Sequence, residues 1–141
     1  MDRRFTYLDH PADAKFRAFG GTLEEAFGNA ALAVASLMWD IGKIRKASSR
    51  PVEVEGLDLQ QLLVKFLSEI PYLVETKRFL VAAVEGVQIE ERNGRFHLKG
   101  VLRGEERPEG YPVFGEVKAV TYSQMEIKKN GRWTVQVVVD M

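Results

Sequence analysis

The sequence contains no cysteine, no surplus of charge of either sign and no long apolar run. Without cysteine, disulfides, thiolate metal sites and cysteine nucleophiles are excluded, and a reducing compartment is favoured. The 20 basic and 20 acidic residues give a formal net charge of zero, which argues against binding nucleic acid through bulk charge. The longest apolar stretch, residues 30–39, is much shorter than the roughly 20 residues that a membrane helix needs. Because no apolar segment follows residues 1–5 either, the sequence predicts a soluble cytoplasmic protein.

Sequence motifs of the common enzyme classes are also missing. The chain has no phosphate-binding loop, no glycine-rich dinucleotide motif, no serine nucleophile elbow and no zinc-protease motif. It has two histidines, His10 and His97, and we expect His97 to face solvent from a strand. The sequence therefore predicts a protein that is not an enzyme.

The first predicted helix begins with a capping box. Thr22 and Glu25 have the spacing at which a hydroxyl and a carboxylate satisfy each other's free backbone N–H groups. Apolar residues then recur at helical intervals as far as Met38.

The second predicted helix begins at Asp58, with Gln61 three residues later. A broad apolar face continues to Val74. Pro71 removes one helical hydrogen bond, to the carbonyl of Leu67, which predicts a kink or break in this helix.

The rest of the chain has the pattern of β-strands. They are expected at residues 5–8, 15–19, 52–54, 81–92, 95–102, 116–129 and 132–139. The pairs Asn93-Gly94 and Asn130-Gly131 predict hairpins with type I′ turns. Each pair precedes an arginine and an aromatic residue, which is consistent either with an internal duplication or with repeated use of a favourable turn. The predicted fold is a single α+β domain over residues 1–141, with two helices packed against a mostly antiparallel sheet.

Carboxylates gather at two places that could bind a metal. Asp9, His10 and Asp13 lie within five residues after a short strand. Such a turn either directs oxygen atoms toward a hard cation or only forms Asx-type turn bonds. At the other end of the chain, Asp140 sets a side-chain carboxylate next to Met141. If this end lies beside the Asp13 turn, several anionic oxygens meet and need a cation; otherwise Asp140 is only an exposed terminal residue.

Two further charged residues have alternative interpretations. Glu69 falls on the second helix and is consistent with a solvated face. Lys118 shares a strand face with Tyr122, where it could meet an anionic partner or serve the structure alone.

Five segments, in this order, resemble motifs of the archease family. They are residues 7–13 (YLDHPAD), 21–27 (GTLEEAF), 66–73 (FLSEIPYL), 118–122 (KAVTY) and 137–141 (VVVDM). The chain departs from the family pattern at Pro11, where threonine is usual, at Pro71, and at Ser123, where histidine is common.

The resemblance implies an α/β sandwich with one metal site, often occupied by calcium in this family. The implied ligands are Asp13, Asp140 and the terminal Met141, and the nearby candidates are Asp9, His10 and Glu69. The implied function is to activate an RtcB-type RNA ligase in tRNA splicing, by promoting guanylylation of the ligase and its multiple turnover. Some relatives are linked to tRNA methyltransferases as chaperone-like partners.

Two other functions remain open. A metal-dependent phosphoesterase could use a carboxylate-bound metal to activate water, although the histidine and carboxylates of a two-metal site are not evident. A general chaperone would bind many partners through exposed apolar surface and would not depend on Asp13.

Overall fold

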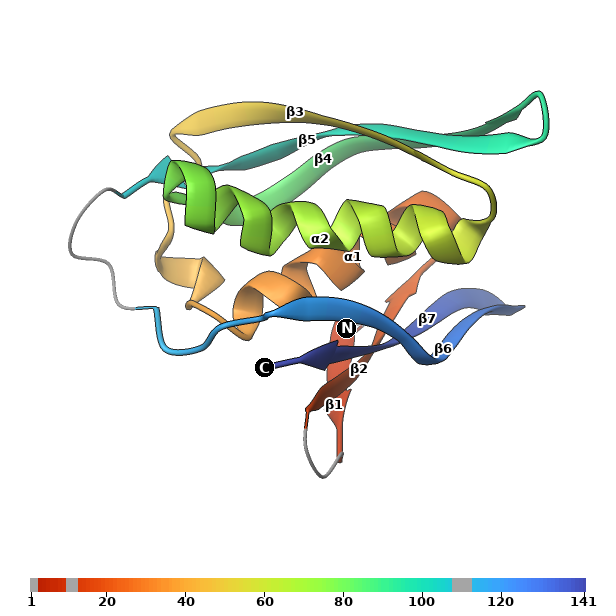
Figure 1. Cartoon of the computed structure of the whole chain (residues 1–141), viewed down its shortest axis with the longest axis horizontal. Helices are drawn as coiled ribbons and strands as arrows, with labels where there is room; N and C mark the ends of the chain where they lie inside the picture. Colours follow the sequence, from red (N-terminus) through yellow and green to blue (C-terminus); the bar gives the residue numbers. More distant parts are fainter. Residues whose placement is uncertain (1–2, 10–12, 108–112) are drawn as a thin grey trace.

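Two helices lie between two antiparallel sheets (Figure 1). The computed structural model describes residues 3–9, 13–107 and 113–141. In chain order its elements are β1 (Phe5–Leu8), β2 (Ala14–Gly20), α1 (Leu23–Ser36), the 3-10 turn η1 (Ile41–Lys43), β3 (Ser48–Gly56), α2 (Leu59–Lys77), β4 (Phe79–Arg92), β5 (Arg95–Glu106), β6 (Ala119–Asn130) and β7 (Arg132–Asp140).

The strands form a four-stranded sheet A, in the order β1-β2-β7-β6, and a three-stranded sheet B, in the order β3-β5-β4. All of the strand pairs are antiparallel. The predicted α+β class is confirmed, and the strands divide into two sheets that enclose the helices. Within the described ranges, no helix has the length and apolar character needed to span a membrane.

Helix α1 forms where the capping residues predict it. The side chain of Thr22 accepts a hydrogen bond of 3.1 Å from the backbone N–H of Glu25. From Ala26 to Ala35 nearly every side chain is buried, and most of them are small. This composition suits a helix that is covered by sheets on two sides.

Helix α2 begins at the predicted cap, where the carboxylate of Asp58 accepts a hydrogen bond of 2.7 Å from the N–H of Gln61. The helix then continues through Pro71 to Lys77, so the predicted break does not occur. Leu67 and Leu73, on either side of the proline, are both buried, and their packing offsets the lost hydrogen bond.

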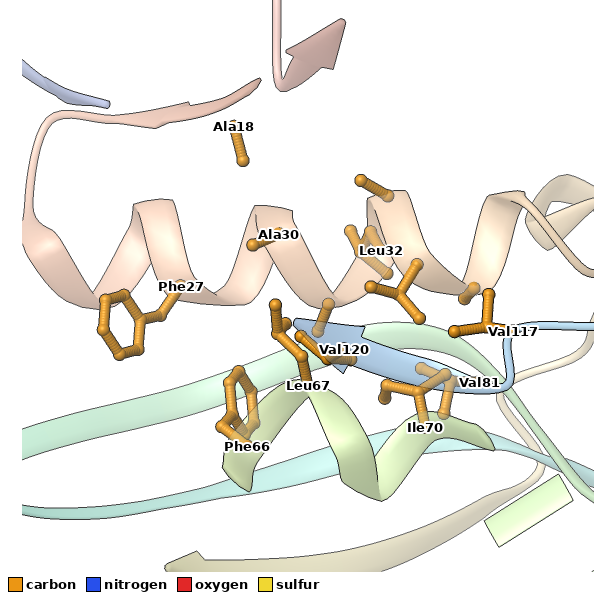
Figure 2. Close-up of a cluster of buried hydrophobic side chains, with 14 of the residues drawn as sticks. Ala18, Phe27, Ala30, Leu32, Phe66, Leu67, Ile70, Val81, Val117 and Val120 are labelled. Carbon is orange, nitrogen blue, oxygen red and sulfur yellow. The ribbon is translucent and has the colours of Figure 1, made fainter. Parts of the chain in front are cut away.

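The core fills the space between the helices and the two sheets. Figure 2 shows Leu67 and Ile70 of α2 close to Val117 and Val120, which belong to β6 and the segment before it. All four side chains are buried. This contact fixes the C-terminal half of α2 beside one edge of sheet A.

The two predicted hairpins form, but in different sheets. Asn93 and Gly94 have φ values of 53° and 76° and join β4 to β5 in sheet B, as a type I′ turn requires. In the turn between β6 and β7, Gly131 has a positive φ, of 76°, and Asn130 does not. The predicted type I′ turn at Asn130 is therefore wrong, because a single residue separates the paired Asn130 and Arg132.

Candidate metal centre

The pairing of β2 with β7 sets the two predicted carboxylates at the same end of sheet A. Ala14 lies opposite Val139 in this antiparallel pair. Asp13 directly precedes Ala14, and Asp140 directly follows Val139. Asp13 lies in the bend just before β2 and Asp140 is the last residue of β7, so both adjoin the last printed pair at this end of sheet A.

Asp140 belongs to the outer face of sheet A, which is turned away from the helices. Phe16 and Val137 are paired and fully buried on the inner face. Asp140, three residues beyond Val137 along β7, alternates to the other face, and Asp13 lies in the bend at the start of β2. Asp13 is half-buried and Asp140 is exposed, so solvent reaches this end of the sheet.

Main-chain contacts fix the position of the chain around Asp140 and Met141. The N–H of Lys118 donates a hydrogen bond of 2.8 Å to the carbonyl oxygen of Asp140. The side chain of Met141 is 39% exposed and lies against Gly115, where an added Cβ would be 3.2 Å from its Cε. The segment before β6 thus supports the last two residues and brings the predicted Lys118 beside them.

A polar network covers the outer face next to Asp13. Gln136 accepts a hydrogen bond of 2.9 Å from Arg17 Nε and donates one of 2.8 Å to the carbonyl oxygen of Gln124. The side chain of Gln124 accepts a further bond of 2.8 Å from Lys15 Nζ. This network connects β2, β7 and β6, and it places Lys15, a cation, two residues from Asp13.

The network depends on a bulge in β6 that the sequence did not reveal. The register shifts between Thr121 and Glu126, and Gln124 has a φ of 53°. The bulge covers the outer face, so that Val138 and Gln136 are only 2% and 4% exposed although they alternate away from the core. Lys118 directly precedes β6 and Tyr122 lies within this irregular stretch, so the shared strand face of the two residues stays a prediction.

The other candidate residues are placed differently. Asp9 follows β1, is exposed, and belongs to the same β1–β2 connection as Asp13. His10 lies outside the described residues. Glu69 is half-buried on α2, and burial raises the pKa of its carboxyl. Its helix neighbours Ser68 and Tyr72 line the hollow beside Lys118, whereas Glu69 does not.

The donor set consists of oxygen atoms. In the part of the chain that the structure describes, no three His, Asp or Glu side chains form a group that could hold a metal. The candidate oxygens at this end of sheet A are the carboxylates of Asp13 and Asp140, with the main-chain carbonyl oxygen of Met141 next to Asp140. Such oxygens fit a hard cation such as Ca²⁺, which takes 6–8 oxygen ligands and accepts water among them.

The chain is similar to proteins of one family over nearly all of its length. Residues 5–141 match the model of the Archease protein family (MTH1598/TM1083). The protein named archease from Methanosarcina acetivorans is 42% identical over 141 residues, which cover 99% of this chain and 97% of that protein. Its counterpart from Pyrococcus furiosus is 39% identical, with 99% of each chain covered.

Two solved structures share the fold. The solution structure of Methanobacterium thermoautotrophicum protein 1598 superposes with a TM-score of 0.83 at 37% identity, and the match covers 98% of this chain and 99% of that one. A crystal structure from Thermotoga maritima, described as an archease and possible chaperone, has a TM-score of 0.57 at 17% identity over 95% and 94% of the two chains. At that identity the second likeness concerns the fold alone. The family match and the relatives together show that this chain belongs to the archease family.

Proposed function

We propose that this protein is a non-catalytic activator of an RtcB-type RNA ligase in tRNA splicing, and that it acts through the end of sheet A that carries Asp13 and Asp140. The observation that supports the proposal is the β2–β7 register, in which Ala14 lies opposite Val139, so that Asp13 and Asp140 adjoin this pair at the same end of sheet A. The match to the archease family favours the same function.

The proposed cofactor is a divalent cation, with calcium favoured by the oxygen-only donor set. Asp13, Asp140 and a main-chain oxygen of Met141 would hold it. When bound, it would supply the positive charge that offsets repulsion between the carboxylates. Asp9 and His10 are candidates for additional ligands from the same connection.

The residues of the chain itself keep this end of the sheet in a fixed arrangement. Lys118 holds the carbonyl of Asp140 through its main-chain N–H, and Gln136 ties β2 to the bulge of β6. A rigid, charged edge of this kind suits docking against another protein. In the proposal, the docked protein favours the form of the ligase that accepts GTP, so that guanylylation is faster and turnover continues.

A guanylylation and ligation assay tests this function. The cognate ligase is combined with GTP, metal and a broken tRNA substrate, with and without this protein. We expect the wild type to increase both guanylylation and the number of turnovers, and we expect Asp13→Asn and Asp140→Asn to lose most of the effect. Glu53→Gln, an exposed carboxylate on β3 of sheet B, is the matched control and should activate fully. Full activation by both Asn variants would refute the role of the two carboxylates.

Calcium removal provides an independent test. Because a ligand that binds only the folded state stabilises it, added Ca²⁺ should raise the melting temperature of the wild type, and chelation should reverse the rise. The increase should be absent in Asp13→Asn and Asp140→Asn and unchanged in Glu53→Gln. A calcium response that is equal in all four proteins would place the cation elsewhere.

A chaperone-like function toward a tRNA methyltransferase is the second candidate. The family match favours it, because the resemblance to archeases implies such chaperone-like partnerships for some relatives. In that case the protein should prevent aggregation or change the specificity of the methyltransferase, and Asp13→Asn should keep the effect. A phosphoesterase is distinguished by turnover of RNA or nucleotide with the protein alone.

A further inference from the structure

A continuous hollow lies between α2 and the segment that leads into β6. One part has a volume of about 580 Å³ and the other of about 280 Å³. The two parts share four lining residues: Pro71 and Glu75 from α2, and Glu116 and Val117 from the other wall. They therefore form one groove that follows the C-terminal half of α2.

Both walls of the groove carry apolar side chains that solvent can reach. Tyr72 on α2 is 56% exposed, and Val113 and Phe114 on the opposite wall are 47% and 67% exposed. Pro71 lines both parts of the groove. Large side chains that remain exposed next to a hollow are typical of a surface that binds another molecule.

The wall opposite the helix includes the start of an edge strand. Among the strands that the structure describes, β6 stands at one edge of sheet A, beside β7. Along such an edge, alternate main-chain N–H and C=O groups point away from the neighbouring strand. An extended peptide placed between α2 and this edge could therefore be bound by main-chain hydrogen bonds, in the manner of β-augmentation.

The charges that line the groove indicate what kind of segment it can bind. Glu75 and Glu116 face the shared middle from the two walls. In the ranges that the structure describes, neither carboxylate has an ion-pair or hydrogen-bond partner. Arg78 lines one part only, and Lys118 only the other. The middle of the groove is therefore acidic, and its two ends are basic.

We propose that this groove binds an extended segment of a partner protein, in which a lysine or arginine lies between apolar residues. The segment adds as a strand to the edge of β6. Its basic side chain lies between Glu75 and Glu116, and its apolar side chains contact Tyr72, Pro71 and Phe114. The groove adjoins the end of sheet A that carries Asp140, through Lys118 and Gly115. Neither Asp13 nor Asp140 lines it, so the proposal does not depend on the cation site.

Charge also argues against a second copy of this chain as the occupant. Two copies that paired through the same edge about a twofold axis would present the same surface to each other. The acidic middle of one groove would then meet the acidic middle of the other, and like charges at short range are destabilising. A basic segment from a different protein avoids this repulsion.

The test is an NMR titration of the ¹⁵N-labelled protein with a capped heptapeptide in which valine alternates with arginine. We expect saturable shifts of the amides of residues 116–120 and 68–78. A peptide with glutamate in place of arginine should not bind. Of two peptides N-methylated on alternate residues, one in each register, the peptide whose methyl groups face the strand edge should lose binding and the other should keep it. Shifts confined to other surfaces, or equal binding of the glutamate peptide, would overturn the proposal.

Variants of the protein make the test independent of the peptide design. The double variant Glu75→Gln/Glu116→Gln should bind the arginine peptide roughly three- to tenfold more weakly, as expected for two solvent-accessible ion pairs. Glu53→Gln/Glu90→Gln, on the outer face of sheet B, should bind like the wild type, and so should Asp13→Asn. Unchanged binding by the first double variant would refute the charge argument. Sedimentation that shows a dimer which Glu75→Lys dissociates would assign the groove to a second copy and likewise overturn the proposal.

Discussion

The indole Nε1–H of Trp39 donates a hydrogen bond of 2.9 Å to the carbonyl oxygen of Val81, 42 residues along the chain. Both residues are fully buried. Val81 lies at a register shift, because Val81 pairs with Gly104 and the next pair is Ala83 with Arg103. The tryptophan thus satisfies a buried carbonyl at the point where the strand ladder is interrupted.

Replacement of Trp39 by phenylalanine should leave that carbonyl without a partner. We expect a loss of about 1–3 kcal/mol in the free energy of unfolding from the hydrogen bond, in addition to the effect of the smaller ring. Denaturant unfolding followed by circular dichroism measures the loss. Trp133→Phe, at a half-buried position in β7, should lower the free energy of unfolding less. An equal decrease in both variants would contradict a role for the Trp39 hydrogen bond.

Gly104 permits the close approach of β5 to β4 at the same register shift. A Cβ added to Gly104 would overlap the carbonyl oxygen of Leu80, and both are main-chain positions that cannot move aside. We expect Gly104→Ala to destabilise the protein by about 3 kcal/mol or more. Gly21→Ala, where nothing lies within 4 Å of the new Cβ, should unfold close to the wild-type midpoint. A Gly104→Ala protein with wild-type stability would contradict this close approach of β5 to β4 at Gly104.

The buried carboxylate of Glu105 should make stability depend on acid. A hydrogen bond from the backbone N–H of Arg45, at 3.1 Å, holds the pKa of Glu105 below its usual value, and the Arg45 and Arg107 side chains add to the effect. A lowered folded-state pKa gives stability that is present above the ordinary pKa and is lost as the pH falls through the folded value.

Glu105→Gln should therefore be less stable than the wild type at pH 7, and the difference should shrink as the pH approaches 3. Thermal unfolding between pH 3 and pH 7 measures this dependence. Glu106→Gln, which removes an exposed pair with Arg50, is the control and should follow the wild-type profile closely. A constant difference across the pH range would argue against a role for the charge of Glu105.

Tyr7 should make stability depend on pH in the opposite direction, with a loss of stability at alkaline pH. Its hydroxyl donates a hydrogen bond of 2.8 Å to the carbonyl of Ala33, and burial raises its pKa to about 12, against a smaller lowering by the hydrogen bond to Ser36. The folded state therefore keeps a proton that the unfolded state loses near pH 10, and stability should fall between pH 10 and pH 12. Tyr7→Phe should remove part of that fall, whereas Tyr122→Phe, at an exposed position, should keep it. Identical alkaline profiles for wild type and Tyr7→Phe would refute the prediction.

The parts of the fold that depend on local sequence could be predicted. The caps at Thr22 and Asp58 are formed as their spacing indicates, because capping depends on residues three positions apart. The lengths of the strands were harder to predict from the sequence. β3 extends over Ser48–Gly56, well beyond the predicted residues 52–54, because its ends are set by pairing with β5. Continuation of α2 through Pro71 likewise reflects packing that distant residues provide.

The candidate site, like the fold, could be predicted only in part from the sequence. Asp13 and Asp140 could be selected from the sequence as carboxylates that would matter if the ends of the fold met, and the pairing of Ala14 with Val139 is the contact that joins them. The bulge around Gln124 and the network through Gln136 could not be foreseen, because Gln136 reads as an exposed residue of an alternating strand. The groove beside α2 depends on helix and edge strand together, and neither segment predicts it alone.

The strand order also determines when each sheet can be completed during synthesis. Sheet B uses a continuous part of the chain, from Ser48 to Glu106, and can assemble as soon as that part has left the ribosome. Sheet A has β7 between β2 and β6, so its second strand waits for the last one to be translated. Until then, β7 does not yet cover its part of the apolar side of α1. The nascent protein is therefore most exposed to aggregation or to chaperone binding in that interval.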